Sequence, residues 1–323
     1  MTTYGSEVLL GTISCLADTT MRLDERVAMH RRQLDFLETI TKRMREEHGC
    51  NPLPYFRVEQ GWDEHREEVL KTTLDLRSIK YPNPISPGSA RNALLRILYE
   101  SDADWLVCMD DDHSLYEHYN GYELIWDLAA TKLLECASKR YLIVPVPAYW
   151  EGFKGEVAKW GKAETHWFLK KSRIYGYLPF CAIPNLVKYG YKPIWFHENH
   201  NLSDVNSIPE DLCFTYDWIA DGGRLLQCYM WAARSCGNMI HSSIFESDTQ
   251  RLDKVKAIHE RWAPKYLKEK FPRNPRLWTE EGFKKNRNPS LVESIPRTWK
   301  YQLKETDMPS AEEIRKHRRK NLN

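Results

Sequence analysis

The residues best suited to chemistry are three consecutive carboxylates, Asp110, Asp111 and Asp112, directly after the apolar run from Trp105 to Met109. Neighbouring like charges repel one another, so the arrangement is costly unless a cation offsets the repulsion. Oxygen ligands suit Mg²⁺ or Mn²⁺, and Mg²⁺ is typically held by carboxylates together with substrate phosphates. The triplet therefore predicts a divalent-metal site beside a phosphate-bearing ligand. The alternative is an Asp-rich turn that caps the next helix.

A second acidic signal, Glu210 and Asp211, opens a predicted helix that runs to about Asp221 and ends at Gly222-Gly223. A carboxylate within hydrogen-bond reach of a hydroxyl can act as a general base. Acids in the first turn of a helix also stabilise it through the helix dipole. The residues alone leave both interpretations open.

These residues need a rigid frame, and the hydrophobic pattern predicts an α/β fold. The apolar run before the triplet is typical of a buried strand of a parallel sheet, and open α/β sheets bind ligands at the carboxyl ends of their strands. The remaining pattern is an alternation of strands and helices, which favours a parallel sheet with crossover helices. Strands are predicted over residues 8–14, 53–59, 141–147, 177–183 and 225–230, and helices over about 20–47, 64–76, 122–138 and 210–221, with Gly49 as a stop signal and a turn of helix over 184–189.

One further helix leads into the acidic strand. Ser86 is well placed as its N-cap and Pro87 as its first residue. Arg91 then lies one turn into the helix, close to the predicted strand end. Such an arginine forms either a structural ion pair or a contact to a phosphate, and the sequence does not separate the two.

Composition sets the broad class. The 323 residues are 42% hydrophobic and 28% charged, which is enough for a sizeable core. No apolar run approaches the roughly 20 residues of a membrane helix, and no basic segment precedes an apolar stretch at the N-terminus as in a signal peptide. The eight cysteines have no close pairs. We therefore expect a cytoplasmic protein with reduced thiols.

The order of these features resembles glycosyltransferases of the GT-A fold: a Ser-Ala-Arg-Asn helix, the strand with the Asp triplet, the Glu210-Asp211 helix and a later histidine, His241. The resemblance spans about residues 7–246 and implies a nucleoside diphosphate sugar donor, with a UDP-sugar as first choice, and Mn²⁺ or Mg²⁺. It makes Asp112 the direct metal ligand, places Asp110 at the ribose or the metal with Asp111 between them, and makes His241 a second metal ligand. Without the resemblance, a lone histidine in an apolar stretch is more often a core residue.

The resemblance also assigns the remaining site. Thr12 and Ser14, at the end of the first strand, match the place where the nucleobase and ribose are held, and Arg91 matches an arginine near the donor. Glu210 and Asp211 match the acceptor site, with Asp211 as the candidate base and Glu210 as its substitute. Whether the sugar's configuration is inverted or retained does not follow from the sequence. In a retaining reaction Asp211 would only position the acceptor.

The acceptor is a separate question. Compact GT-A proteins of this kind look like phage enzymes that glycosylate hydroxymethylated pyrimidines in DNA, which would place the protein in the host cytoplasm. Aromatic and basic residues mix in the last third of the chain, as on surfaces that stack bases and bind phosphates. Tryptophans at 150, 160, 167 and 195 suit a flipped base or a sugar ring equally. We expect a transferase domain over 1–250, with a nucleotide-sugar half over about 1–147 and an acceptor half over 148–250, and a basic extension over 251–323.

Three alternatives remain. The acceptor hydroxyl can belong to a glycan, a lipid-linked molecule or a protein. A nucleotidyltransferase also uses clustered carboxylates and a metal, but such enzymes usually carry a Gly-rich phosphate loop after the first strand, and Gly11 to Ser14 is a poor one. Lastly, the chain can be a non-catalytic nucleic-acid-binding protein whose acids only cap helices.

Overall fold

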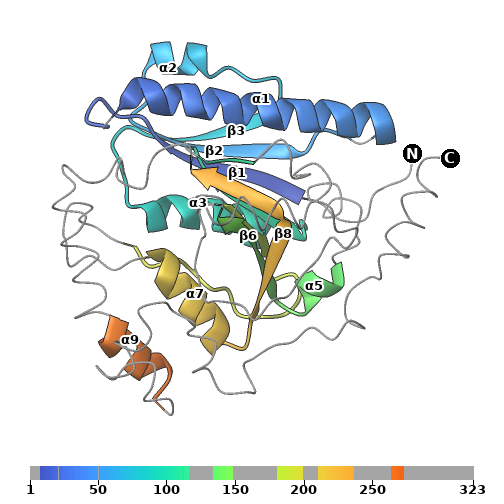
Figure 1. Ribbon diagram of the computed structural model, residues 1–323, viewed down its shortest axis with the longest axis vertical. Helices are drawn as coiled ribbons and strands as arrows, with labels where there is room; N and C mark the ends of the chain where they lie inside the picture. The colour runs from blue at the N-terminus through green and yellow to red at the C-terminus, as the bar shows by residue number, and fades with distance from the viewer. Residues whose placement is uncertain are drawn as a thin grey trace.

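The computed structural model describes residues 8–20, 22–49, 51–111, 113–115, 134–147, 180–198, 210–235 and 263–272. Within these ranges the chain forms one sheet in the order β3-β2-β1-β4-β7-β6-β8-β5 (Figure 1). The strands are β1 Val8–Cys15, β2 Pro54–Gln60, β3 Asp75–Tyr81, β4 Trp105–Asp110, β5 His113–Leu115, β6 Tyr141–Pro147, β7 Phe180–Pro184 and β8 Arg224–Ser235.

The sheet is mostly parallel. Six of its strands run in one direction, and β7 and β5 run antiparallel to their neighbours. β7 lies between β4 and β6, so the sheet takes strands from both predicted halves of the transferase domain. The α/β fold class with a mostly parallel sheet is confirmed.

Helices cover both faces of the sheet, with α1 and α2 on one side and α3 and α7 on the other (Figure 1). Their bounds are α1 Leu23–His48, α2 Glu64–Val69, α3 Pro87–Glu100, α5 Leu134–Ser138, α7 Glu210–Ala220 and α9 Ala263–Lys270. Alternate residues of β1 point to opposite faces, as the period of a strand requires. Val8 and Leu10 pack in the core with α1, and Leu9 and Ile13 pack in the core with α3 and α7.

The predicted helix boundaries hold where strong local signals exist. Gly49 ends α1 in the left-handed conformation at φ 65°, where a Cβ is unfavourable. The Ser86 hydroxyl accepts a hydrogen bond from the Ser89 amide at 3.0 Å, and Pro87 begins α3 as expected. The Arg91 side chain is thereby set at a fixed position on the second turn of α3.

Two predicted elements are wrong. The helix predicted over 64–76 ends at Val69, and residues 75–81 form β3, an edge strand whose exposed polar side chains hide the usual alternation. Residues 184–189 are not a turn of helix: Pro184 ends β7, and residues 186–190 form hydrogen-bonded turns. There the Asn185 side chain bonds to carbonyls of the neighbouring segment instead.

Several predictions fall outside the described residues: the first twelve residues of the 122–138 helix, most of the aromatic region 148–208, and nearly all of the C-terminal extension. Within the described ranges no helix is both long enough and apolar enough to cross a membrane.

Candidate functional site

The candidate site lies at the carboxyl edge of the sheet, where β1 and β4 end side by side. Ile13 on β1 is paired with Asp110 on β4, so Ser14 and the first two residues of the Asp triplet meet there. The N-terminal half of α1, the start of α3 and the first turn of α7 bring further charged side chains to this edge. This is the position at which open α/β sheets bind ligands.

Arg91 joins the two acidic signals of the sequence. Its Nη2 donates to both carboxylate oxygens of Asp110 at 2.9 Å, and its Nη1 donates to Glu210 Oε1 at 2.7 Å. The arginine side chain is only 4% exposed, compared with 20% for Asp110 and 16% for Glu210. The structure therefore shows the ion pair and brings Arg91, Asp110 and Glu210 into one cluster, while the predicted contact of Arg91 with the donor stays a prediction.

The electrostatics of this cluster favour a permanently charged arginine. Burial alone would lower the pKa of Arg91, but the carboxylates of Asp110 and Glu210 outweigh it and raise that pKa above its ordinary value. Asp211 adds to the same negative field. A buried charge of this kind is tolerated because several partners share it.

Asp111 has a different environment from Asp110. Its carboxylate accepts a hydrogen bond from the Ser14 hydroxyl at 2.7 Å and forms an ion pair with Arg26 of α1. The Asp111 side chain is only 1% exposed. Its amide donates to the Ile13 carbonyl at 3.2 Å. Asp111 thus fixes the end of β4 against β1 and α1.

The other two predicted nucleotide contacts are also buried in this layer. Thr12 lies beneath α1, with its hydroxyl 3.4 Å from Gln33 Oε1, and Gln33 Nε2 donates to the Asp110 carbonyl at 2.8 Å. Ser14 is bonded to Asp111 as described. In this arrangement Thr12 and Ser14 support the acidic strand end, and their predicted contact with a nucleobase or ribose stays a prediction.

Sequence reasoning missed Arg26 and Gln33. They are seven residues apart, two turns of α1, and His30 lies between them on the same face. Leucines and isoleucine dominate the buried face of α1, so its few polar residues give only a weak signal. The available signal was that these polar residues lie on the buried face of a helix that begins at the carboxyl edge of the sheet.

The residues predicted to bind a metal lie largely outside the described ranges. Asp112 and His241 are not described, and among the residues that are, no group of three or more His, Cys, Asp and Glu side chains is arranged to hold an ion. The carboxylate of Asp110 accepts hydrogen bonds from Arg91. The carboxylate of Asp111 accepts hydrogen bonds from Ser14 and Arg26. The described residues therefore do not form a metal site by themselves.

The two carboxylates predicted for the acceptor site lie at the start of α7, as the sequence predicted. Glu210 and Asp211 occupy its first turn, and the Thr215 hydroxyl donates to the Asp211 carbonyl at 3.0 Å. Since Glu210 binds Arg91, the pair does more than cap the helix. The geometry places both acids beside the end of β4.

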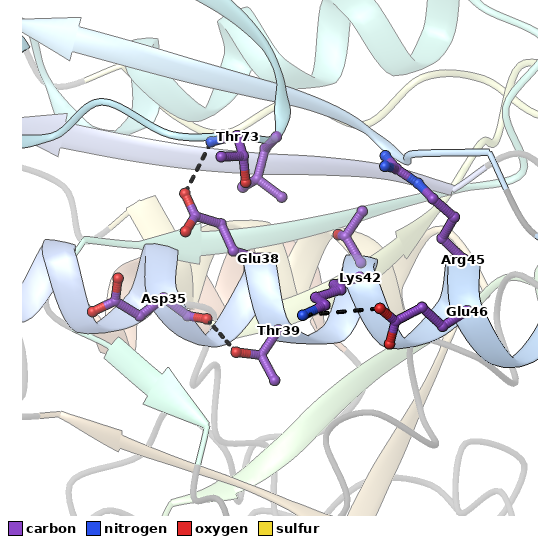
Figure 2. Close-up of a pocket in the computed structure, with 9 residues that line it drawn as sticks. Asp35, Glu38, Thr39, Lys42, Arg45, Glu46 and Thr73 are labelled. Atoms are coloured by element: carbon purple, nitrogen blue, oxygen red, sulfur yellow. Dashed lines mark hydrogen bonds and ion pairs between the residues drawn. The ribbon is translucent and has the colours of Figure 1, made fainter.

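A pocket of about 560 Å³ lies elsewhere, between α1 and the segment before β3 (Figure 2). Its lining comes from the C-terminal half of α1 and from Thr73 and Leu74, at the amino edge of the sheet. Glu38 accepts from the Thr73 amide at 3.0 Å, and Lys42 pairs with Glu46 at 3.8 Å, so its charges largely satisfy one another. This pocket takes no part in the candidate site.

No protein-family profile and no curated protein matches the sequence. Among solved structures, the chain is similar to residues 1–349 of TarS from S. aureus in complex with UDP-GlcNAc, with 13% identity over 98% of this chain and 89% of that one and a TM-score of 0.48. It is also similar to GalNAc-T7 with UDP, GalNAc and Mn²⁺, with 11% identity over 90% of this chain and 58% of that one and a TM-score of 0.40.

A third similar structure is the galactosyltransferase LgtC in complex with donor and acceptor sugar analogues, with 13% identity over 57% of this chain and 60% of that one and a TM-score of 0.29. At these identities and scores, the three likenesses assign neither a family nor an activity to the chain.

Proposed function

We propose that the protein is a glycosyltransferase that moves a sugar from a nucleoside diphosphate sugar, with a UDP-sugar as first candidate, to an acceptor hydroxyl. The observation that supports it most is the Arg91 bridge, which joins the acid at the end of β4 to the acids that open α7. In this proposal Asp110 belongs to the donor side and Glu210 to the acceptor side, and their common position at one edge of a mostly parallel sheet supports the transfer of a sugar between them.

The proposed reaction assigns a task to each side. The acceptor hydroxyl attacks the anomeric carbon, the bond from that carbon to the phosphate oxygen breaks, and the nucleoside diphosphate leaves with the electron pair. A carboxylate takes the proton of the hydroxyl. Asp211 is the preferred base, as the resemblance implies, with Glu210 as its substitute. Glu210 and Arg91 together then hold the first turn of α7 at the donor.

A divalent cation is part of the proposal, with Asp112 and His241 as its protein ligands and Mn²⁺ or Mg²⁺ as the ion. When bound, such an ion would stabilise the charge that develops on the leaving diphosphate. Asp110 lies in this proposal at the edge of the donor site, where Arg91 orients it. Residues 1–250 would form the transferase domain and 251–323 an extension.

For the acceptor, the likeness to phage enzymes favours a hydroxymethylated pyrimidine in DNA, and a glycan is the alternative. The DNA proposal depends on the aromatic region 148–208 and on the basic extension, of which the structure describes only residues 180–198 and 263–272.

Calorimetric titration of UDP and UDP-sugars tests the donor proposal, with and without Mn²⁺, into wild type and Asp112→Ala. We expect metal-dependent binding that is lost in the variant and retained in Asp102→Ala, which removes an exposed carboxylate before β4. If no nucleotide or sugar nucleotide binds under any metal condition, the proposal is wrong and the acids are structural.

A further inference from the structure

A tryptophan stands exposed on the surface beside α3, the helix whose second turn carries Arg91. Trp195 lies in the extended segment 191–198 between β7 and α7, and its residue is 39% exposed. Among the described residues it shares this property with only Val69 and Val187 of the large hydrophobic side chains. An exposed indole is common where a protein binds a flat, partly apolar ligand face.

The segment that carries Trp195 is held firmly on α3. Asn92 binds the backbone of Phe196 from both sides, accepting from its amide at 2.8 Å and donating to its carbonyl at 2.9 Å. The Tyr99 hydroxyl donates to the Ile194 carbonyl at 3.0 Å. The ring of Tyr99 meets that of Trp195 edge-to-face, with 5.2 Å between the centroids. The indole is therefore presented in a fixed orientation.

Polar groups surround this indole. A pocket of about 400 Å³, within the range of roughly 300–1,000 Å³ that is usual for small-molecule sites, is lined by Asn92, Arg96, Glu100, Trp195, Phe196 and Glu198. Within the described part of the chain Arg96 has no ion-pair partner, and its side chain is exposed. The lining combines one aromatic face with the guanidinium of Arg96 and two carboxylates, groups that donate to and accept from hydroxyls.

The pocket adjoins the Arg91 cluster. Phe196 lines the pocket, and its ring centroid is 5.5 Å from Cζ of Arg91. Asn92 follows Arg91 directly on α3. The pocket thus shares Phe196 with the surroundings of Arg91, while Trp195 itself packs on Tyr99, two turns further along α3.

We infer that Trp195 and its pocket form a saccharide subsite for the acceptor, in which the indole stacks on one face of a pyranose ring while Arg96 and Glu198 bind its hydroxyls. The inference rests on the proposed sugar transfer, and for the acceptor it favours the glycan, named above as the alternative, over DNA. An unpaired cation and two carboxylates give the lining a net charge of −1. A negative lining favours an uncharged polyhydroxylated ligand over the phosphate backbone of DNA, which needs basic contacts.

Saturation-transfer NMR tests the inference without any donor. The probes are the methyl glycosides of glucose, galactose, mannose and N-acetylglucosamine, each added to the full-length protein, and a short single-stranded DNA oligonucleotide that contains hydroxymethylcytosine. We expect transfer to the ring protons of at least one glycoside, with its affinity reduced about tenfold or more in Trp195→Ala, as for truncation of an aromatic anchor. Arg96→Ala, an exposed change that leaves the fold intact, should weaken the same signal. Val187→Ala, another exposed apolar residue, should not.

The inference is overturned if no glycoside binds, if glycosides bind equally to wild type and to both pocket variants, or if only the oligonucleotide depends on Trp195. The last result would make the indole a base-stacking platform. Because no sugar nucleotide is present, failure here leaves the calorimetric test of the donor untouched, and failure of the donor test leaves this binding measurable.

Discussion

Arg91 is the residue on which the site depends. One guanidinium balances two carboxylates that lie 19 and 119 residues away in the sequence. Desolvating a charge is expensive, and the cost is offset only while its partners remain in place. The ion pair therefore couples the fold of the chain to the position of its candidate acids.

Replacement of this arginine should be severe. In Arg91→Met the carboxylates of Asp110 and Glu210 lose their shared cation, and we expect the free energy of unfolding in urea to fall by about 3–5 kcal/mol. Arg91→Lys should recover part of the loss, since an ammonium keeps the charge but not the two-oxygen contact with Asp110. Arg96→Met, an exposed change on the same helix, should alter stability by less than about 0.5 kcal/mol. Equal stability of Arg91→Met and wild type would show that the bridge contributes nothing.

At the residue scale, the sequence predicted which residue types lie at the site but not which side chains pair with one another. It predicted acids at the end of β4 and an arginine near them, because both follow from helix and strand boundaries. The pairing of Asp111 with Ser14 and Arg26 did not follow, since it depends on how α1 lies across β1. Contacts between elements distant in sequence need the packed structure.

At the scale of elements, α3 connects the core to the site. Gly88, in the first turn of α3, allows the segment 191–198 to lie close against this helix. A Cβ on Gly88 would lie 2.0 Å from the backbone carbonyl oxygen of His197. A Gly-to-Ala change inside a helix is normally favourable by roughly 0.5–1 kcal/mol. Here we expect the opposite sign, a loss of about 1–3 kcal/mol in urea unfolding, because the segment must move outward. A higher free energy of unfolding for Gly88→Ala than for wild type would mean that the segment moves aside without destabilising the fold.

The C-terminal end of α3 depends on a residue that follows β7. The buried amide Nδ2 of Asn185 donates to the carbonyls of Leu98, Ser101 and Ala103 at 2.7, 3.0 and 2.9 Å. Asn185→Ala removes this shared donor, although the Leu98 carbonyl still accepts from the amide and hydroxyl of Ser101. We expect a loss of about 1–3 kcal/mol in thermal or urea unfolding. Asn185→Asp should be worse than Ala at neutral pH, since it places an anion against three carbonyl oxygens. The reverse order would contradict this account of the end of α3.

Element boundaries were predicted well where a glycine, a proline or an N-cap defined them, as at Gly49, Ser86 and Pro87. The strand β3 was missed because its side chains are mostly exposed, so its polar sequence does not alternate. The direction of β7 was not predicted either. Nothing in the five residues Phe180–Pro184 distinguishes an antiparallel strand from a parallel one.

At the scale of the whole molecule, buried His30 links stability to pH. Burial, aided by the charge of Arg57, lowers the pKa of His30 well below its ordinary value of 6.5. Between the folded pKa and about 6.5 the unfolded chain binds more protons at this residue than the folded chain does. The stability of the wild type should therefore fall as the pH drops through that window, and His30 should have no such effect above it.

The slope of stability against pH isolates this effect. In His30→Gln we expect the slope of the unfolding free energy between pH 5 and 6.5 to shrink by up to about 1.36 kcal/mol per pH unit, whatever the variant's absolute stability. His65→Gln, at an exposed position, should keep the wild-type slope. An unchanged slope in His30→Gln would mean that another group carries the acid sensitivity.

The position of β7 has a consequence for how the protein is made. One edge of β4 pairs with β1, which precedes it in the chain. Its other edge pairs with β7, because β6, although made before β7, bonds to β7 and β8 and not to β4. During synthesis the first half of the chain therefore emerges with an open sheet edge next to its acidic strand end, a surface prone to pairing with other chains. The free edge of β4 is covered only after residue 184 has left the ribosome, and the bridge to Arg91 needs Glu210 as well. The site therefore cannot assemble before the chain has been made as far as Glu210, and until then the open edge is a surface of the kind that chaperones shield.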